Sequence, residues 1–253
     1  MSRIVIVGCR GRMGKMLVER SRECGLDDVH GVDQPLDAAA VAEACTGAAL
    51  VVLCVPVLVF GKVLAKICPH LPADCVLADI TSVKERPILL MQQWWDGPVV
   101  GSHPLFGPQP DWSGDLPVTI SPPPGTPEAA TALVEDFCRK LGFRPFRATA
   151  QEHDKAMARI QNMNYITNVA YFAMLAERED LLSYLTPSFR RRLDAARKML
   201  TEDAEMFSAL FEANAHSQEA TRQFSRMLNI AAAGDVELLC KRAQWWWRDE
   251  RNS

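Results

Sequence analysis

The sequence has no marked excess of charge of either sign. Its 28 lysine and arginine residues nearly balance 31 aspartate and glutamate residues, which gives a net charge of -3 over 253 residues. Without a basic field the chain lacks the usual electrostatic means of binding nucleic acid or an anionic lipid surface. We therefore expect neither nucleic acid nor a membrane among its partners.

Long apolar segments are also lacking. The longest apolar run, residues 48–60, has 13 residues and contains Pro56, whereas a helix that spans a bilayer needs about 20. The first three residues lead directly into an apolar strand, without the layout of a signal peptide. We expect a cytoplasmic protein in which the long run forms a buried strand.

Paired cysteines and metal-ligand spacings are missing as well. The eight cysteines include no CxxC pair, and no spacing of His, Cys and carboxylate residues is typical of a metal site. Several cysteines lie inside apolar runs, which indicates buried free thiols in a reducing compartment. The sequence therefore predicts no bound metal.

Residues 1–148 alternate strand and helix signals. Apolar, β-branched runs at 4–7, 29–32, 48–55, 75–79 and 98–101 are separated by helical segments, and residues 143–147 fit a last strand. A capping hydroxyl and a proline at Thr126 and Pro127 predict a further helix start. Near-continuous apolar strands predict a parallel sheet with helices on both faces. The expected fold of this part is a doubly wound, Rossmann-type α/β domain.

The pattern changes at residue 149. Thr149 and Glu152 fit a capping box, and the residues that follow recur at helical spacing. Gly234 followed by Asp235 predicts that one helix stops and another begins. We therefore expect an all-α domain over residues 149–253. Its apolar faces exceed what a lone bundle of this size needs, which predicts a homodimer formed through the helices.

A glycine-rich turn separates the first strand from the first helix. Gly8, Gly11 and Gly14 spell GxxGxxG, and glycines in such a turn allow the backbone to approach a pyrophosphate closely. The helix N-terminus adds amide donors and a partial positive charge. A dinucleotide site is therefore predicted, and its expected residues also include Arg12, Met13, Val55 and Pro56.

Asp33 indicates which dinucleotide binds. It follows Gly14 by 19 residues, at the end of the second strand, where a carboxylate can accept hydrogen bonds from both ribose hydroxyls of NAD and repel the extra phosphate of NADP. An ordinary solvated aspartate is the alternative. Arg10 and Arg12 keep the choice open, because an arginine in the turn could reach a pyrophosphate or a 2′-phosphate. The expected cofactor is NAD.

Two polar segments follow later strands. Ser82-Val83-Lys84 comes after one strand, and Gly101-Ser102-His103-Pro104 comes after the next. Loops at the carboxyl ends of parallel strands bind ligands, and an imidazole is suited to general-base catalysis near neutral pH. His103 is therefore the candidate base, and a purely structural loop histidine is the alternative.

These motifs give the chain a family resemblance. The GxxGxMG turn, the SVK of residues 82–84, the GxHPxFGP around His103 and the Glu152-His153-Asp154 segment resemble those of the prephenate and arogenate dehydrogenases. The chain is most similar to the dehydrogenase part of the bifunctional enzymes that carry a fused chorismate mutase. The resemblance implies oxidative decarboxylation of prephenate to 4-hydroxyphenylpyruvate with hydride transfer to NAD, a step of tyrosine biosynthesis.

The same resemblance implies roles for individual residues. His103 would accept the proton of the ring hydroxyl, and Ser82 would hydrogen-bond His103 or that hydroxyl. Lys84 would lie near cofactor or substrate, with a surface lysine at a helix start as the alternative. His153 is expected only as a helix-start residue. The substrate contacts implied by the family are Ser82, Lys84, Gln109, Gln161, Tyr165, Arg190 and Lys198.

Some of these positions depart from the family pattern. Tyr165 stands eleven residues after Asp154, where relatives have a histidine, and Lys198 stands where they have a carboxylate-binding arginine. Arg190 matches the family directly, while its neighbours Arg191 and Arg192 are expected to be solvated. Gln109 replaces an acidic residue of several relatives, which favours the keto side chain of prephenate over the amino group of arogenate.

Three alternative functions stay open at this point. The substrate could be arogenate or another amino-substituted analogue. The chain could be an NAD-binding regulator that has lost turnover, although Ser82, Lys84 and His103 together argue for an enzyme. A β-hydroxyacid dehydrogenase would need a catalytic lysine on the first long helix, and Lys155 lies too close to the helix start.

Overall fold

The computed structural model describes residues 3–248, so residues 1–2 and 249–253 of the two predicted domains lie outside the described residues. Seven strands form one sheet in the order β2-β1-β3-β4-β5-β6-β7. The first five are parallel, β6 runs antiparallel to β5, and β7 runs parallel to β6. The strands are β1 (Arg3–Val7), β2 (Val29–Val32), β3 (Ala48–Leu53), β4 (Val76–Asp79), β5 (Val99–Pro104), β6 (Pro117–Ser121) and β7 (Arg144–Arg147).

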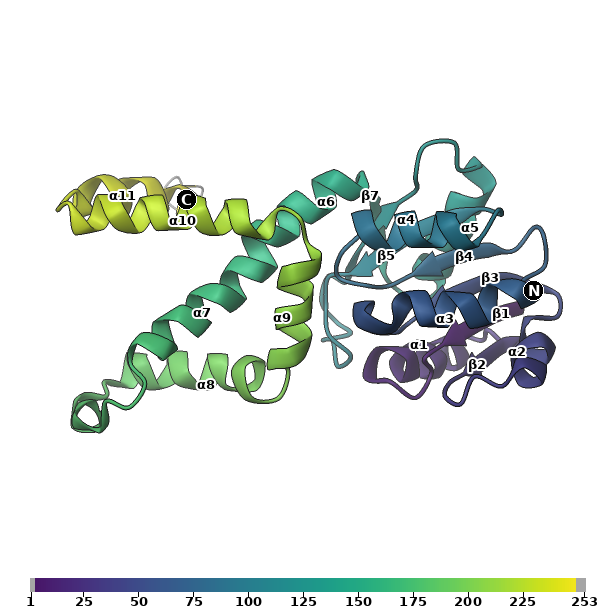
Figure 1. Cartoon of the computed structure of the whole chain (residues 1–253), viewed down its shortest axis with the longest axis horizontal. Coiled ribbons are helices and arrows are strands. Elements are labelled where there is room, and N and C mark those ends of the chain that lie inside the picture. Colours follow the sequence, from purple (N-terminus) through teal and green to yellow (C-terminus); the bar gives the residue numbers. More distant parts are fainter. Residues whose placement is uncertain (1–2, 249–253) are drawn as a thin grey trace.

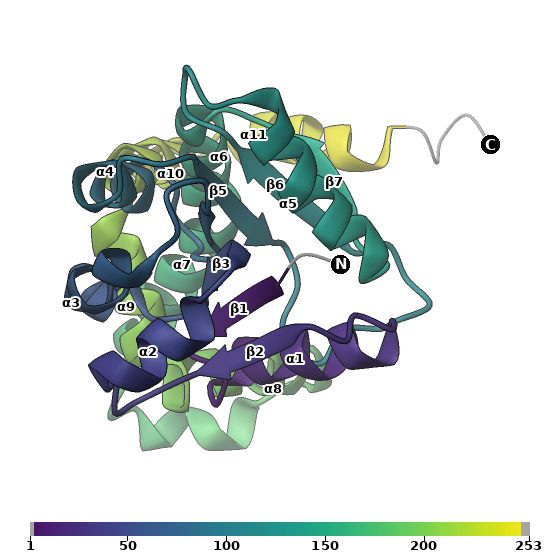
Figure 2. The same cartoon turned by 90° about the vertical axis from the view of Figure 1, so that its right-hand side faces the viewer.

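Helices cover both faces of this sheet (Figures 1 and 2). Successive side chains of a strand point to opposite faces, so Ile4 and Ile6 of β1 join one core while Val5 and Val7 join the other. Helices α1 (Arg12–Glu23) and α5 (Glu128–Lys140) pack on the first face. The opposite face carries α2 (Ala38–Cys45), α3 (Phe60–Ile67) and α4 (Glu85–Trp94), with the short 3-10 helices η1 (Val57–Val59) and η2 (Cys68–His70). The predicted doubly wound sheet is confirmed.

The strand that carries the candidate base is longer than predicted. We expected it to end at residue 101, but β5 continues to Pro104, because the unpredicted strand β6 pairs with it and places His103 opposite Thr119. His103 therefore belongs to the strand itself rather than to the loop behind it. A helix begins within the Thr126-Pro127-Glu128 segment as predicted, since α5 starts at Glu128, but the Thr126 hydroxyl donates to the carbonyl of Val99 instead of capping that helix.

The chain beyond residue 149 is helical. The capping box at Thr149 and Glu152 is confirmed, and Gly234, with a φ of 97°, separates two helices as predicted. The helices are α6 (Ala150–Met157), the π-helix η3 (Ala158–Asn162), α7 (Met163–Met174), the 3-10 helix η4 (Glu179–Tyr184), α8 (Pro187–Thr201), α9 (Ala204–Ala213), α10 (Ser217–Ala232), α11 (Val236–Ala243) and the 3-10 helix η5 (Gln244–Trp247).

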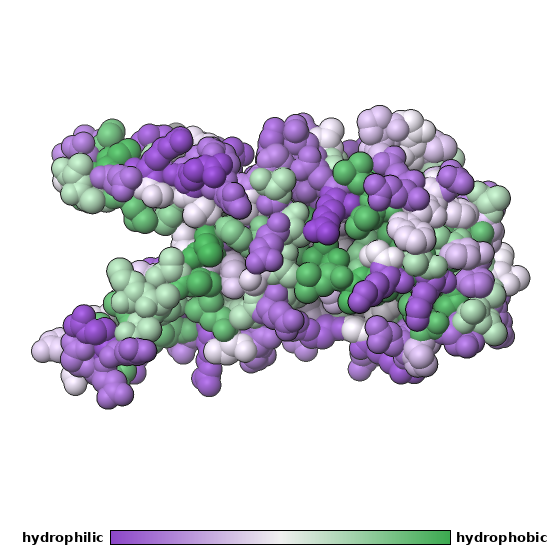
Figure 3. All heavy atoms as spheres, in the orientation of Figure 1, coloured by the Kyte–Doolittle hydropathy of each residue, from purple (hydrophilic) through white to green (hydrophobic). Residues whose placement is uncertain are grey.

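The helices form two arms that extend from the sheet. In Figure 1, α6, η3 and α7 make one continuous rod, α9 stands between α8 and the sheet, and α10 with α11 forms the second arm. The space between the arms is a groove of about 600 Å³ lined by residues of η3, α7, α10 and α11, and it is visible as a hollow in Figure 3. No helix within residues 3–248 has the length and apolar character needed to cross a bilayer.

Candidate active site

The glycine turn between β1 and α1 is held by close backbone contacts. Gly8 has a φ of +85°, and a Cβ added to it would lie 2.5 Å from the carbonyl oxygen of Cys54. A Cβ on Gly14 would lie 2.1 Å from the carbonyl oxygen of Gly8. Side chains at either position would therefore push the helix away from the two strands, which explains why both residues are glycine.

The turn is suited to a pyrophosphate. Lys15 donates the first hydrogen bond within the helix, to the carbonyl of Gly11, so the amides of Arg12, Met13 and Gly14 have no partner inside α1. The first turn of α1 contains no acidic residue, and the helix N-terminus carries a partial positive charge. The Met13 side chain packs against the core, so its contribution to a phosphate would come from its amide.

A hollow of about 150 Å³ lies beside this turn. Its lining brings together five of the residues that we predicted for the cofactor: Gly8, Gly11, Asp33, Val55 and Pro56. The strand order reverses between β1 and β3, and such a crevice is where doubly wound sheets bind dinucleotides. The residues therefore fit an adenosine half of NAD.

Asp33 is fixed at the rim of this hollow. Its Oδ2 accepts a hydrogen bond from the Arg10 amide at 2.7 Å, and its Oδ1 accepts one from the Gln34 amide at 2.7 Å. The carboxylate is thereby oriented by backbone donors, while lone pairs on both oxygens remain for further donors. This geometry suits a residue that receives two ribose hydroxyls.

Lys84 lies inside the protein rather than on its surface. The side chain is fully buried, and its Nζ donates to the carboxylate of Asp79 and to the carbonyl of Ser102. Burial lowers the pKa of Lys84, and the carboxylates of Asp79 and Asp154 oppose that shift. The alternative of a surface lysine is wrong. A direct contact between this ammonium and a ligand stays a prediction, and two of its three N–H donors are already used by Asp79 and Ser102.

His103 hydrogen-bonds another histidine. Its Nδ1 lies 2.9 Å from Nε2 of His153 on α6, with the rings at 77° to each other. Both side chains are almost fully buried, with exposed fractions of 5% and 3%. His153 lies near the start of α6 as expected, and its contact with His103 is an additional feature that was not predicted. Ser82 is half-buried on the loop before α4 and forms no hydrogen bond with His103 in this structure, so its alternative contact, with the substrate hydroxyl, stays a prediction.

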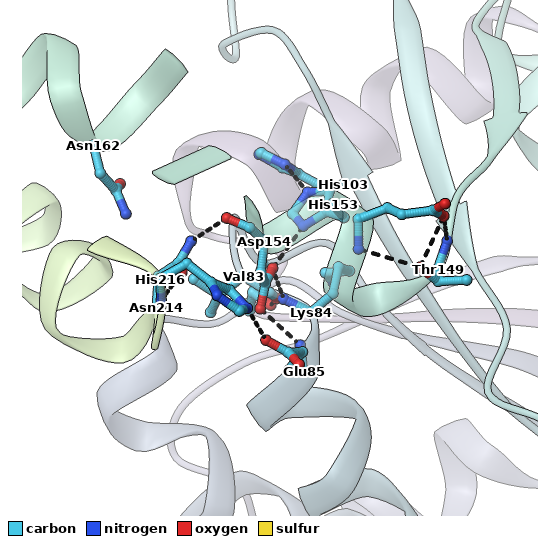
Figure 4. A network of polar contacts seen from close by, with 12 residues as sticks. Val83, Lys84, Glu85, His103, Thr149, His153, Asp154, Asn162, Asn214 and His216 are labelled. Carbon is cyan, nitrogen blue, oxygen red and sulfur yellow. Dashed lines mark hydrogen bonds and ion pairs between the residues drawn. The ribbon is translucent and has the colours of Figure 1, made fainter. Parts of the chain in front are cut away.

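A chain of polar contacts extends from His153 across the two halves of the molecule (Figure 4). His153 Nδ1 lies 2.7 Å from Oδ1 of Asp154, and the Asp154 carboxylate accepts the amides of Lys84 at 2.7 Å and Glu85 at 2.9 Å. These amides begin α4, so Asp154 caps a helix of the sheet domain from a helix of the other half. The Asn214 amide group donates to the Asp154 carbonyl at 2.8 Å.

The surroundings of His103 favour its neutral form. Burial lowers the pKa of His103 well below 6.5, and the nearby His153 and the Lys84 ammonium lower it further. A neutral imidazole at neutral pH has a free lone pair, which is the requirement for a general base.

The substrate residues expected in the helical half are spread along it. Gln161 lies in the π-helix η3, and its Oε1 is buried without a partner among the described residues. Tyr165 on α7 is buried, donates to the carbonyl of Ala204 at 3.3 Å and stacks on Phe207. π-Helical turns often occur at functional sites, which supports a role for Gln161.

The two cations expected on α8 are both exposed. Arg190 and Lys198 are eight residues apart, or about 12 Å along a helix. Gln109 is exposed on the loop after β5. Arg192 is exposed, as expected, and its guanidinium also lies 4.0 Å from the ring centre of Tyr171.

The sequence reasoning missed the roles of Asp79, His153 and Asp154. The Glu152-His153-Asp154 segment carries only a family resemblance in the sequence, which does not show that Asp154 accepts the Lys84 amide or that His153 contacts His103. Among residues 3–248, no group of three or more His, Cys, Asp or Glu side chains is arranged to hold a metal ion.

The fold and this geometry define a class of protein. A doubly wound sheet with a glycine turn for a dinucleotide, and a buried neutral histidine at the same sheet edge, make this an NAD-dependent dehydrogenase. Residues 17–142 match the family model of the prephenate dehydrogenase nucleotide-binding domain. The chain is 30% identical to the T-protein of Enterobacter agglomerans, over 97% of this chain and 68% of that protein. It therefore belongs to the prephenate dehydrogenase family of NAD-dependent oxidoreductases.

Solved structures with the same fold include members of this family. A prephenate dehydrogenase from Aquifex aeolicus, in complex with hydroxyphenyl propionate and NAD+, has a TM-score of 0.83 and 19% identity, covering 100% of this chain and 99% of that one. The arogenate dehydrogenase of Synechocystis has a TM-score of 0.69 and 22% identity, covering 99% of each chain. At these identities the likeness concerns the fold.

Proposed function

We propose that this chain oxidises prephenate to 4-hydroxyphenylpyruvate and passes the hydride to NAD. The observation that carries the proposal is the buried His103, which is tied at Nδ1 to His153 and has Nε2 left for a substrate. It stands at the carboxyl end of β5, on the sheet edge where β1 presents the glycine turn.

The chemistry needs one base and accurate positioning. When bound, NAD+ supplies the acceptor for the hydride that leaves the carbon bearing the ring hydroxyl. His103 Nε2 takes the proton of that hydroxyl, so that the oxygen becomes a carbonyl as the hydride departs. The ring carboxylate then leaves as carbon dioxide, and its bonding electrons complete the aromatic ring while the carbonyl electrons move onto the oxygen, which takes up a proton to become the phenol hydroxyl of the product. Aromatisation makes the step effectively irreversible, so the protein mainly has to orient the reactants.

The side chain of the substrate distinguishes prephenate from arogenate. Prephenate carries a keto group where arogenate carries an ammonium group. Gln109 is neutral and exposed on the loop behind His103, and it offers no charge to pair with an ammonium group. The bound hydroxyphenyl propionate in the Aquifex aeolicus enzyme also lacks an amino group. Arogenate is the alternative substrate, as in the Synechocystis relative.

A direct assay tests this proposal. The purified full chain is given prephenate or arogenate, each with NAD or NADP, and we expect the highest kcat/KM for prephenate with NAD. His103→Asn should lower kcat by about 10²–10⁴-fold, the usual contribution of a general base. His70→Asn, which changes a histidine at the end of η2, is the matched control. Turnover by His103→Asn at the unmodified rate would overturn the assignment.

We further propose that the chain is a homodimer formed through its helical arms. The groove between the arms is lined by Met163, Phe224 and Met227, among others, and Phe224 and Leu228 of α10 are 40% and 54% exposed. Apolar surface of this kind is typical of an interface between subunits. Figure 3 shows apolar residues along the inner walls of the hollow.

The oligomeric state is measurable by light scattering after size exclusion. The unmodified chain should have twice the mass of 28.1 kDa, and Leu228→Glu should shift it toward the monomer. Leu89→Glu, at an equally exposed leucine on α4 of the sheet domain, should leave the mass unchanged. A monomeric unmodified chain would disprove the proposal. The cytoplasmic location stays a prediction.

A further inference from the structure

The contacts of the Asp154 carboxylate determine where the proton of the neighbouring His153 ring lies. Its two oxygens receive the amides of Lys84 and Glu85, which can only donate, so the carboxylate is ionised and acts only as an acceptor. The amides open helix α4, and the partial positive charge of a helix N-terminus stabilises an anion. His153 Nδ1, at 2.7 Å from Asp154 Oδ1, must therefore carry a proton and donate it.

The proton on His153 Nδ1 fixes the neighbouring bond. A neutral imidazole with a proton on Nδ1 has only a lone pair on Nε2. The atom that faces this lone pair, at 2.9 Å, is Nδ1 of His103. If His103 Nδ1 also carried a lone pair, no hydrogen bond could form between these two buried nitrogens. His103 therefore carries its proton on Nδ1 and has its lone pair on Nε2.

We propose that His153, anchored by Asp154, is a positioning residue that holds His103 in the tautomer with a free lone pair on Nε2. This inference rests on the proposed role of His103 as the base, and it names the residue that makes that role possible. The other neutral tautomer would present an N–H to the substrate hydroxyl, and it could not accept a proton there.

The same contacts provide a place for the positive charge after the reaction. When His103 takes a proton on Nε2, its Nδ1 proton can pass to His153 Nε2. His103 is then neutral with its proton on Nε2, and His153 is an imidazolium beside the Asp154 carboxylate. No proton is gained or lost beyond the one taken from substrate. The charge then lies on the histidine whose Nδ1 is 2.7 Å from the Asp154 carboxylate.

Two substitutions of His153 separate the two parts of this proposal. His153→Phe removes both the acceptor for His103 Nδ1 and the group that takes the charge, and we expect kcat to fall at least about tenfold with little change in the KM for NAD. His153→Gln keeps an amide oxygen that can accept from His103 Nδ1 and an amide nitrogen that can donate to Asp154. It should restore much of the lost kcat, while the acid limb of the pH profile should differ from that of the unmodified enzyme.

Nitrogen-15 NMR of the histidine rings reads the tautomer directly. The chain has five histidines, so single replacements assign each signal. We expect His103 of the unmodified enzyme to show a protonated Nδ1 and an unprotonated Nε2 near neutral pH, and His153→Phe to show a mixture of both tautomers. This readout in the unmodified protein stands even if His153→Phe fails to fold. His216→Gln, which loses a contact with Glu85 in the same interdomain cluster, should leave the His103 signal unchanged.

The outcomes distinguish this inference from the proposed function. Turnover by His103→Asn at the unmodified rate means that the base is wrongly assigned. An inactive His103→Asn together with an unaltered kcat and pH profile in His153→Phe means that only the positioning role is wrong. A His103 that carries its proton on Nε2 in the unmodified enzyme also overturns the positioning role.

Discussion

The guanidinium of Arg12 lies 2.6 Å from the carboxylate of Asp203. Arg12 is the first residue of α1, directly after Gly11 of the glycine turn, and Asp203 immediately precedes α9. The contact joins the predicted pyrophosphate site to the helical half of the molecule. Asp203 holds the pKa of Arg12 above its ordinary value, so the guanidinium stays charged beside the turn.

Replacing Arg12 separates its contact with the cofactor from its contact with Asp203. If the guanidinium reaches the pyrophosphate, Arg12→Gln should raise the Kd for NAD about tenfold by calorimetry, as expected for loss of a charge-assisted bond. Asp203→Asn removes only the ion pair, and should lower the free energy of unfolding by less than about 1 kcal/mol because the pair is partly exposed. Equal Kd values for Arg12→Gln and the unmodified chain would assign Arg12 to the domain contact alone.

Asp33 should govern the choice between NAD and NADP. Its carboxylate is fixed by two amides at the rim of the cofactor hollow, where it would repel a 2′-phosphate. Asp33→Ser should therefore narrow the ratio of kcat/KM for NAD to that for NADP. Steady-state kinetics with both cofactors provide the measurement. Better use of NADP by the unmodified enzyme would show that Arg10 or Arg12 controls the preference.

The pH dependence of the reaction should reflect the buried base. The proposed base His103 would act in its neutral form, and its pKa is lowered well below 6.5 by burial, by His153 and by Lys84. The groups that face it are His153 and Asp154 from α6, Lys84 from the loop before α4 and, behind Lys84, Asp79 from β4. We expect kcat/KM to stay level from about pH 8 down to 6.5 and to fall only in more acidic solution.

The same shift has a consequence for stability. A histidine whose pKa is lower in the folded state binds fewer protons than in the unfolded chain, so its effect on stability is absent above pH 6.5. Below 6.5 the unfolded chain takes up the proton first, and the free energy of unfolding should decrease. In the kinetic profile, an acid limb of kcat/KM centred above pH 6.5 would contradict the assignment of His103 as the titrating base.

Lys198 should bind a substrate carboxylate if the family position has kept its role. Lys198→Ala should then raise the KM for prephenate more than it lowers kcat. This result is expected when the lost contact stabilised the bound substrate and the transition state equally. Lys198→Arg should be tolerated, because the guanidinium can form a bidentate contact. Arg190→Ala should raise KM on the order of 10–100-fold, whereas Arg191→Ala serves as the control. A silent Lys198→Ala with a damaging Arg197→Ala would move the anion site by one residue along α8.

Local patterns in the sequence predicted much of the fold. The apolar strands and the glycine turn depend on neighbours within a few residues, and Thr149 with Glu152 encodes its own helix start. Strand β6 was missed because it lies between proline-rich segments, which are typical of loops rather than of a strand.

The candidate site was predicted less completely. His103 could be chosen from its motif, but its partner His153 is 50 residues away along the chain. The burial of Lys84 likewise depends on Asp79 and on the carbonyl of Ser102. Such contacts form when a sheet and a separate helix come together, and no local spacing records them.

Because of the position of Asp154, a substitution at this residue would affect stability and catalysis together. One carboxylate caps the first turn of α4 and also anchors the two histidines. A substitution of Asp154 would remove the cap of α4 and the charge partner of His153 in a single event. A descendant of this chain that lost the orientation of His103 through this residue would therefore also lose contacts that join the two halves of the molecule. Substitutions that reduce catalysis would therefore have to arise first at other residues, such as Tyr165 or Lys198, whose side chains do not cap a helix.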